Sequence, residues 1–239
     1  MVERSDLERF RTANAELSRM VKEALEAFFA SLDLARPEAA RDSLLEFTPV
    51  LVAQYGEVAA ALAADWYEEL TGSTGAALAR SVDAATVASQ VRYAAGHLWT
   101  PQPAAALGVL SVQVDKFVKQ PGRDTIASNA RRGRVRWARV PTGSKTCAWC
   151  LTLASRDAVY LSERSASKAA DGSDYHGDCD CVPTPLGSRD DYPEGYDPDE
   201  YYRMYQVARD QAGSGDIKEI AAAMRRSFPD HVRDGVVEH

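Results

Sequence analysis

Residues 140–185 read VPTGSKTCAWCLTLASRDAVYLSERSASKAADGSDYHGDCDCVPTP, and this stretch holds all four cysteines of the chain and one of its four histidines. A C-x-x-C pair comes first, and the motif H-x-x-C-x-C follows after a loop. A C-x-x-C turn directs two thiolates at one centre, and ligands from a second segment can complete the tetrahedron that Zn²⁺ favours. The candidate metal ligands are Cys147, Cys150, His176, Cys179 and Cys181.

Five candidates compete for the four positions of a tetrahedral zinc site. The first two cysteines with His176 and Cys179 make the most economical set, because C-x-x-C and H-x-x-C are similarly short. Cys181 is then a spare thiol or an alternative ligand. Two disulfides are a second interpretation, but four cysteines in 239 residues is a low density for a disulfide scaffold, and residues 1–11 lack the apolar centre of a secretion signal. A thioredoxin-like redox pair should follow a buried strand, whereas the polar turn PTGSKT precedes this one.

Enzyme motifs are missing from the sequence. Zinc deaminases need a Glu two residues after a metal-binding His, and zinc proteases need H-E-x-x-H; the chain contains neither pattern. The chain also lacks a G-x-S-x-G nucleophile motif and a Gly-rich phosphate loop. With four or five protein ligands available, no position is left open for a reactive water. We therefore expect a structural metal, no catalytic residues and no enzymatic activity.

The segments ARVPTGSKTCAWCLTLASRDAVYLS and YHGDCDC resemble the Mu F-type minor head proteins of tailed bacteriophages, particularly phages of actinobacteria. The similarity covers about residues 123–185. It implies a virion protein of the phage head, present in the host cytoplasm during assembly, that acts with the portal protein or the major capsid protein. The family's second motif varies at its end, which implies that Cys179 is the firmer ligand and Cys181 the dispensable one. Asp157 departs from the family, where Gly is expected.

Composition is consistent with a globular protein. The chain is 45% hydrophobic and 26% charged, and its 239 residues can form one large domain or two small ones. No continuous apolar run approaches the roughly 20 residues that cross a bilayer, so no membrane partner is expected. The net charge of −7 argues against binding of nucleic acid by the molecule as a whole.

The first half has the apolar spacing of helices, and we predict an all-α domain over residues 1–122. One helix should span residues 6–34, and a second should run from Pro37 to a stop at Gly72, with a restart or kink at Pro49. A third, capped by Ser81 or Asp83, should continue to Leu98. A fourth over residues 107–118 should end at the sequence Gln-Pro-Gly of residues 120–122.

Residues 123–139 form the most basic region of the chain, and residues 134–140 alternate as a half-buried strand does. Val135 and Trp137 should face inward, and the arginines should project from one face. That face could contact packaged double-stranded DNA, or it could be a solvated surface paired with the acidic tail. The candidate nucleic-acid ligands are Arg131, Arg132, Arg134, Arg136 and Arg139.

We predict an α+β fold: an N-terminal all-α block, a small zinc-stabilised module of short strands over residues 123–186, and an acidic linker with C-terminal helices over residues 187–239. The last helices should cover residues 200–209 and 217–227. Tyrosines of this region could face a partner or, more simply, pack back onto the zinc module. The tyrosines are Tyr192, Tyr196, Tyr201, Tyr202 and Tyr205.

These observations favour a structural minor head protein with a structural zinc site that acts next to the portal in head assembly and DNA packaging. One alternative is a DNA-binding zinc module in packaging or regulation, for which the arginines are the evidence. A capsid maturation protease is another alternative, and no Ser/His pair supports it.

Overall fold

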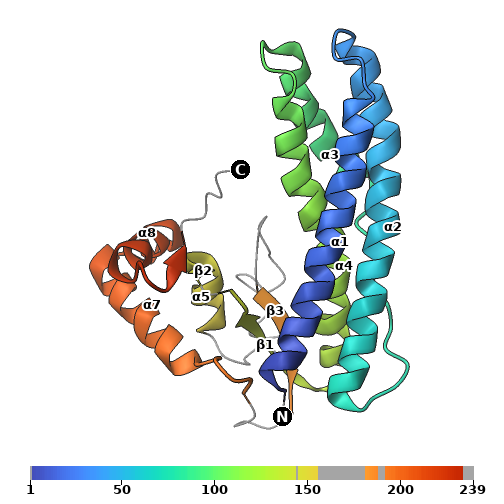
Figure 1. The fold of residues 1–239 in the computed structure, drawn as a ribbon. Helices are drawn as coiled ribbons and strands as arrows, with labels where there is room; N and C mark the ends of the chain where they lie inside the picture. The colour runs from blue at the N-terminus through green and yellow to red at the C-terminus, as the bar shows by residue number, and fades with distance from the viewer. Residues whose placement is uncertain (1, 144, 156–180, 188–191, 234–239) are drawn as a thin grey trace.

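The computed structural model describes residues 2–143, 145–155, 181–187 and 192–233. An elongated bundle of helices forms the first half, and a smaller C-terminal module packs beside one end of it (Figure 1). The predicted α+β class is confirmed, because the described residues are mainly helical with four short strands. The N-terminus lies at the end of the bundle that meets the module (Figure 1).

The bundle consists of α1 (Arg4–Ala30), α2 (Pro37–Thr71), α3 (Ala84–Ala95) with the 3₁₀ turn η1 (Gly96–Trp99), and α4 (Ala105–Gly133). Local signals set several of these ends. Pro37 occupies the first turn of α2, and Gly72 ends it in the left-handed conformation at φ 66°. The Asp83 carboxylate caps α3 by accepting hydrogen bonds from the first backbone N–H groups of the helix. These boundaries confirm the sequence predictions, although α1 ends at Ala30 rather than at residue 34.

The predicted helix end at residues 120–122 is wrong. Helix α4 continues through Pro121 and Gly122 to Gly133, so the expected boundary at 122/123 lies inside one helix. Packing against α2 explains why Gly is tolerated here: a Cβ on Gly122 would lie 2.9 Å from the Ala59 carbonyl oxygen. Gly122 therefore lets the two longest helices approach closely. Helix α2 likewise runs through Pro49 without a restart.

This close approach predicts opposite effects for two glycines of α4. Gly122→Ala should lower the free energy of unfolding by about 1–2 kcal/mol, because overpacking against backbone outweighs the gain in helix propensity. Gly108→Ala is the matched control: nothing lies within 4 Å of its Cβ position, so the same change should stabilise the protein by up to about 1 kcal/mol. Urea unfolding of both variants measures the difference, and stabilisation by Gly122→Ala would contradict the packing described.

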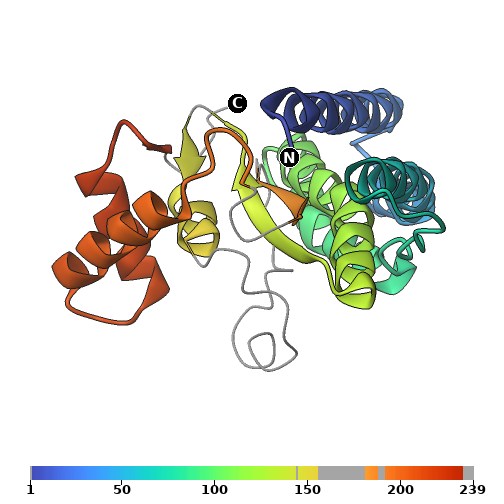
Figure 2. The same cartoon turned by 90° about the horizontal axis from the view of Figure 1, so that it is seen from below.

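The C-terminal module holds two pairs of short strands. Strand β1 (Arg136–Pro141) pairs antiparallel with β3 (Cys181–Leu186), and β2 (Thr146–Cys147) pairs parallel with β4 (Val232–Arg233). Helices α5 (Ala148–Ala154), α7 (Pro198–Ala212) and α8 (Ile217–Ser227) complete it, with α7 and α8 on the side away from the bundle (Figure 2). The two predicted C-terminal helices are confirmed. Residues 158–161, whose sequence Ala-Val-Tyr-Leu favours a strand, lie outside the described residues.

Three apolar clusters form the core. One fills the bundle around Val21, Leu44 and Leu110. A second lies at the base of the bundle and is shared, because Leu7 and Trp66 of the bundle pack in it with Trp137 and Leu186 of β1 and β3. The third joins α5 to α7 and α8. The β1–β3 ribbon therefore continues the core of the bundle, whereas α5 belongs to the core of the C-terminal helices.

Helix α2 is long and apolar enough to cross a bilayer by length and composition alone. Charged residues such as Glu46 and Glu57 interrupt the apolar stretch of α2, so the sequence holds no continuous apolar run of that length. In the fold, α2 lies against α1, α3 and α4 and contributes Leu44, Val52 and Ala59 to the bundle core. Its hydropathy is thus that of the central helix of a bundle.

Residues 72–83 connect α2 to α3 along the surface of α4. The Asn129 side chain accepts a hydrogen bond from Ala77 N (2.9 Å) and donates one to Ala77 O (2.8 Å), and Thr125 Oγ1 accepts one from Ala79 N (2.9 Å). Thr125 and Asn129 are four residues apart, which corresponds to a rise of about 6 Å along a helix. Ala77 and Ala79 are two residues apart, which corresponds to roughly 6.6 Å of extended chain. The match in spacing indicates an extended segment antiparallel to α4.

A buried acid, Asp115 of α4, is only 2% exposed and is paired with Lys119, whose Nζ lies 2.7 Å from its Oδ2. Burial alone would raise the pKa of Asp115. The charge and hydrogen bond of Lys119, with smaller contributions from Ser18 and Lys22, outweigh burial and hold this pKa below its ordinary value.

The lowered pKa predicts a pH-dependent contribution to stability. The ionised form of Asp115 is favoured by folding, so its contribution is present above the ordinary carboxyl pKa near 4 and is lost as the pH falls through the lower folded value. Asp115→Asn should cost about 2 kcal/mol at pH 7, and the deficit should shrink below about pH 4. Thermal unfolding from pH 7 to pH 2.5 tests this, with the exposed Asp42→Asn as control. A deficit that stays constant with pH would contradict the assignment.

Candidate functional site

Three cysteines from two distant parts of the sequence meet in one buried cluster. Cys147 ends β2, Cys150 lies in the first turn of α5, and Cys181 begins β3, where it pairs with Pro141 of β1. All three are buried and pack together, and Trp149 lies against them. Among the described residues, no two cysteines form a disulfide with each other.

The C-x-x-C segment has the turn that its spacing predicts. Cys147 is the N-cap of α5 with extended backbone, and its Sγ accepts a hydrogen bond from the backbone N–H of Cys150 at 3.2 Å. An N–H group that donates to sulfur favours the negatively charged thiolate over the thiol. The thiolate is the form of cysteine that binds metal ions.

Residues 229–233, which follow α8, support this turn. Strand β4 pairs with β2 so that Arg233 lies opposite Cys147, and the Thr146 backbone N–H donates to His231 O at 3.1 Å. The Lys145 ammonium group also donates to Pro229 O at 2.8 Å. Residues 229–233 therefore help to hold the segment that carries Cys147 in place. No sequence pattern predicted this contact.

The structure tests only part of the predicted ligand set. Cys147 and Cys150 lie together as predicted, and Cys181, expected to be a spare thiol or an alternative ligand, lies beside them. His176 and Cys179 are outside the described residues. Within the described part of the chain, the side chains of His, Cys, Asp and Glu do not by themselves form a group of three that could hold a metal ion. The three cysteines share one buried cluster, and thiolate sulfur is a ligand type that zinc accepts, but a complete metal site would also need ligands from outside the described residues.

The predicted basic face does not form as expected. Arg139 is 0% exposed in the middle of β1, so the prediction that the strand arginines project together from one face is wrong for it. The strand is covered on both sides, because its residues from Trp137 to Pro141 are all buried. Arg136 is half-buried at the start of the strand.

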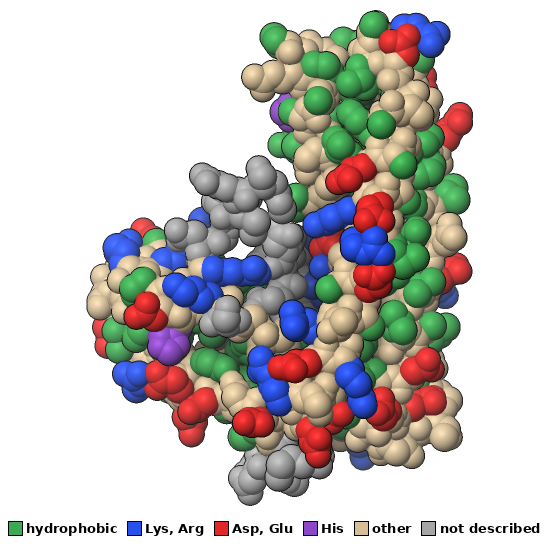
Figure 3. Space-filling view, in the orientation of Figure 1, with side chains coloured by type: hydrophobic (Ala, Val, Ile, Leu, Met, Phe, Trp, Pro, Cys, Tyr) green, Lys and Arg blue, Asp and Glu red, His purple; other side chains and the backbone are tan. Residues whose placement is uncertain are grey.

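The other candidate arginines lie at the end of α4. Arg131 and Arg134 are exposed, whereas the Arg132 guanidinium donates to Asn129 Oδ1 (2.5 Å) and Gly75 O (3.2 Å). Arg132 therefore has a structural contact with the connection between α2 and α3. On the face shown in Figure 3, Lys and Arg side chains over the bundle are interspersed with Asp and Glu. Of the five candidates, three are exposed, and one of these three, Arg132, is engaged within the fold.

The tyrosines of the C-terminal region mostly pack inward. The buried Tyr196 hydroxyl donates to Ala154 O at 3.0 Å, and its ring contacts Tyr192 and Tyr201 at centroid distances of 5.5 and 5.7 Å. Packing onto the module, the simpler of the two interpretations, is confirmed for these three. Tyr202, stacked on Tyr205 at 6.3 Å, is half exposed.

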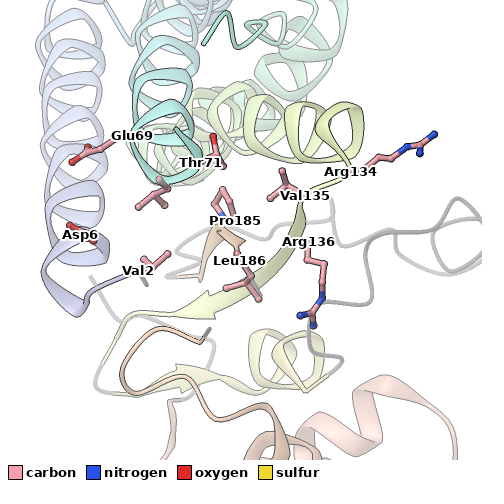
Figure 4. A pocket seen from close by; sticks show the side chains of 11 residues that line it. Val2, Asp6, Glu69, Thr71, Arg134, Val135, Arg136, Pro185 and Leu186 are labelled. Atoms are coloured by element: carbon pink, nitrogen blue, oxygen red, sulfur yellow. The ribbon is translucent and has the colours of Figure 1, made fainter. Parts of the chain in front are cut away.

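A pocket of about 730 Å³ lies where the bundle meets the β1–β3 ribbon (Figure 4). We call it the junction pocket. The start of α1, the end of α2, the α4–β1 connection and the end of β3 each contribute to its lining. Sequence reasoning missed it, since four segments far apart in the chain form it and none carries a ligand motif.

A family model described as VG15 protein matches residues 1–208. The chain belongs to the VG15 protein family. The match includes the whole bundle, the cysteine cluster and most of α7.

A curated relative supports a phage origin for this VG15 family chain. It is 30% identical to the "Gene 15 protein" of Mycobacterium phage D29, in a match that covers 38% of this chain and 44% of that protein. The match thus spans less than half of the relative's length. No solved structure is similar enough to this VG15 chain to count as a match. The chain is therefore placed in a phage protein family.

Proposed function

We propose that this VG15 family chain is a structural minor head protein of a tailed phage, in which a structural zinc ion fixes the C-terminal module. The observation that carries the proposal is the meeting of Cys181 with Cys147 and Cys150 in one buried cluster. The motifs that supply these cysteines are the ones that resemble the Mu F-type minor head proteins. Membership of a phage family supports the same role.

The zinc site would be completed from the second motif. Cys147, Cys150 and Cys181 would supply three thiolates, and His176 or Cys179 would supply the fourth ligand. Four protein ligands leave no open position, which is typical of a structural rather than a catalytic site. We therefore propose a role in assembly and none in catalysis.

The position of the cluster explains what a metal would stabilise. Cys181 leads into β3, whose Val182 and Leu186 belong to the cluster at the base of the bundle. The C-x-x-C segment leads into α5, whose Ala148 and Leu151 pack with the C-terminal helices. A metal bound by both segments would join two separate cores and fix the orientation of the C-terminal helices relative to the bundle.

The expected partners are the portal protein, the major capsid protein or both, in the host cytoplasm during assembly and then in the phage head. A protein partner agrees with the net charge of −7. The alternative of DNA binding is weakened, because Arg139 is buried and Arg132 is engaged within the fold. Packaged double-stranded DNA is therefore the less favoured partner.

Sedimentation of assembled particles tests the proposed role. A tagged chain expressed with the portal and major capsid proteins should sediment with portal complexes or heads and should remain there in high salt. A chain that stays in the soluble fraction and binds duplex DNA in a salt-dependent manner would favour the DNA-binding alternative instead.

A further inference from the structure

The junction pocket has the size and composition of a site for a short segment of polypeptide. Pockets of about 300–1,000 Å³ are typical of ligand sites, and they often lie where two parts of a fold meet. Its apolar lining includes Val2, Val135 and Leu186. Figure 4 shows these side chains between two charged sides.

The two charged sides of the pocket differ in whether their side chains already form ion pairs. On the side of α1 and α2, the carboxylates of Asp6 and Glu69 share the Arg9 guanidinium, at distances of 3.0 and 2.7 Å. On the opposite side, Arg134 and Arg136 extend outward from the α4–β1 connection (Figure 4). Among the residues that the structure describes, none forms an ion pair with the Arg134 side chain. Arg134 is thus available to a ligand, whereas on the acidic side one guanidinium, that of Arg9, already partly compensates the two carboxylates.

The backbone at Arg134 gives independent support. Arg134 ends α4 in the left-handed conformation at φ 54° and ψ 32°, and it is the only residue other than glycine with positive φ in the described part of the chain. This conformation costs a residue with a side chain about 1–2 kcal/mol, and helices usually place Gly there. Here Gly133 precedes the position and Arg fills it. An arginine at a position with this conformational cost is consistent with a functional role for its side chain.

We propose that the junction pocket binds an extended segment of a partner protein, with an apolar side chain on the floor and an acidic side chain on Arg134. The apolar floor and the carboxylates of Asp6 and Glu69 fit a peptide better than a nucleic-acid backbone, whose phosphates those carboxylates would repel. The inference depends on the pocket alone, and not on the metal site or on a role in the phage head.

Fluorescence anisotropy with labelled, end-blocked hexapeptides tests the proposal on the full-length protein. The panel places a central leucine next to two aspartates, two serines or two lysines. The acidic peptide should bind saturably and about fivefold more tightly than the basic peptide, since an exposed ion pair of about 1 kcal/mol corresponds to that ratio. No saturable binding of the acidic peptide, or equal binding of the basic one, would overturn the proposal.

Substitutions separate binding from folding. Arg134→Gly removes the charge and suits the left-handed backbone, so it should weaken acidic-peptide binding about fivefold while Tm stays equal or rises. Arg131→Ala, an exposed arginine that does not line the pocket, is the matched control and should bind like the unaltered protein. Unchanged peptide binding by Arg134→Gly would contradict the proposed site. Displacement of the peptide from this site by duplex DNA would also contradict it.

Discussion

Replacing Cys181 by serine should remove the metal from the purified protein as completely as replacing Cys147 does. The three thiols share one buried cluster, so in the proposed zinc site each would supply one ligand. The binding free energy of a structural metal contributes to folding. Its loss should therefore lower the free energy of unfolding by at least about 3 kcal/mol. Metal content by mass spectrometry and unfolding by urea measure the two effects. The family resemblance predicts the opposite, that Cys181 is dispensable, so the measurement decides between the two expectations.

The control for the cysteine variants lies on α5, the helix that carries Cys150. Thr152 of α5 is buried and donates its hydroxyl to Ala148 O at 2.9 Å. Thr152→Val keeps the shape and loses that one hydrogen bond, so it should cost about 1 kcal/mol and retain the metal. A Cys181→Ser protein that keeps one metal per chain and full stability would show that Cys181 is a buried spare thiol.

Replacing Asn129 by alanine should destabilise the bundle by about 3 kcal/mol. The buried amide of Asn129 satisfies both backbone groups of Ala77 and also accepts a hydrogen bond from Arg132. Removing it leaves polar backbone atoms unpaired against α4 and opens a cavity, and each lost hydrogen bond costs about 1 kcal/mol or more. Urea unfolding should show the loss, and hydrogen exchange of the Ala77 amide should accelerate.

A second asparagine provides the control for this prediction. Asn14 of α1 makes one hydrogen bond through its amide, to Phe10 O of its own helix at 2.8 Å. Because alanine is the better helix former, Asn14→Ala should change stability by less than about 0.5 kcal/mol. If Asn129→Ala has an equally small effect, the connection over residues 72–83 is not held by this amide.

Local chemistry explains which features the sequence predicts well. A proline in the first turn at Pro37, a left-handed glycine at Gly72 and capping aspartates at Asp83 and Asp216 act within a few residues of chain, and the helices begin or end there. The C-x-x-C turn at Cys147 is local in the same way.

The failures of prediction have tertiary causes. Gly122 reads as a helix stop, yet it marks the close approach of α2, because a Cβ there would lie 2.9 Å from Ala59 O. In the alternating pattern of residues 134–140, Arg139 occupies a position expected to face solvent, but other elements cover both sides of β1. The position of Cys181 depends on its pairing with Pro141 across the ribbon. No local pattern contains such long-range contacts.

Zinc K-edge X-ray absorption of the full-length protein, compared with the Cys181→Ser variant, tests the central claim most directly. We predict bound zinc with at least three sulfur ligands at about 2.3 Å in the unaltered protein. The Cys181→Ser protein should lose the metal or one sulfur ligand. Absence of zinc from protein purified under reducing conditions, or an identical sulfur shell in both proteins, would contradict a metal centre that joins β3 to the C-x-x-C turn.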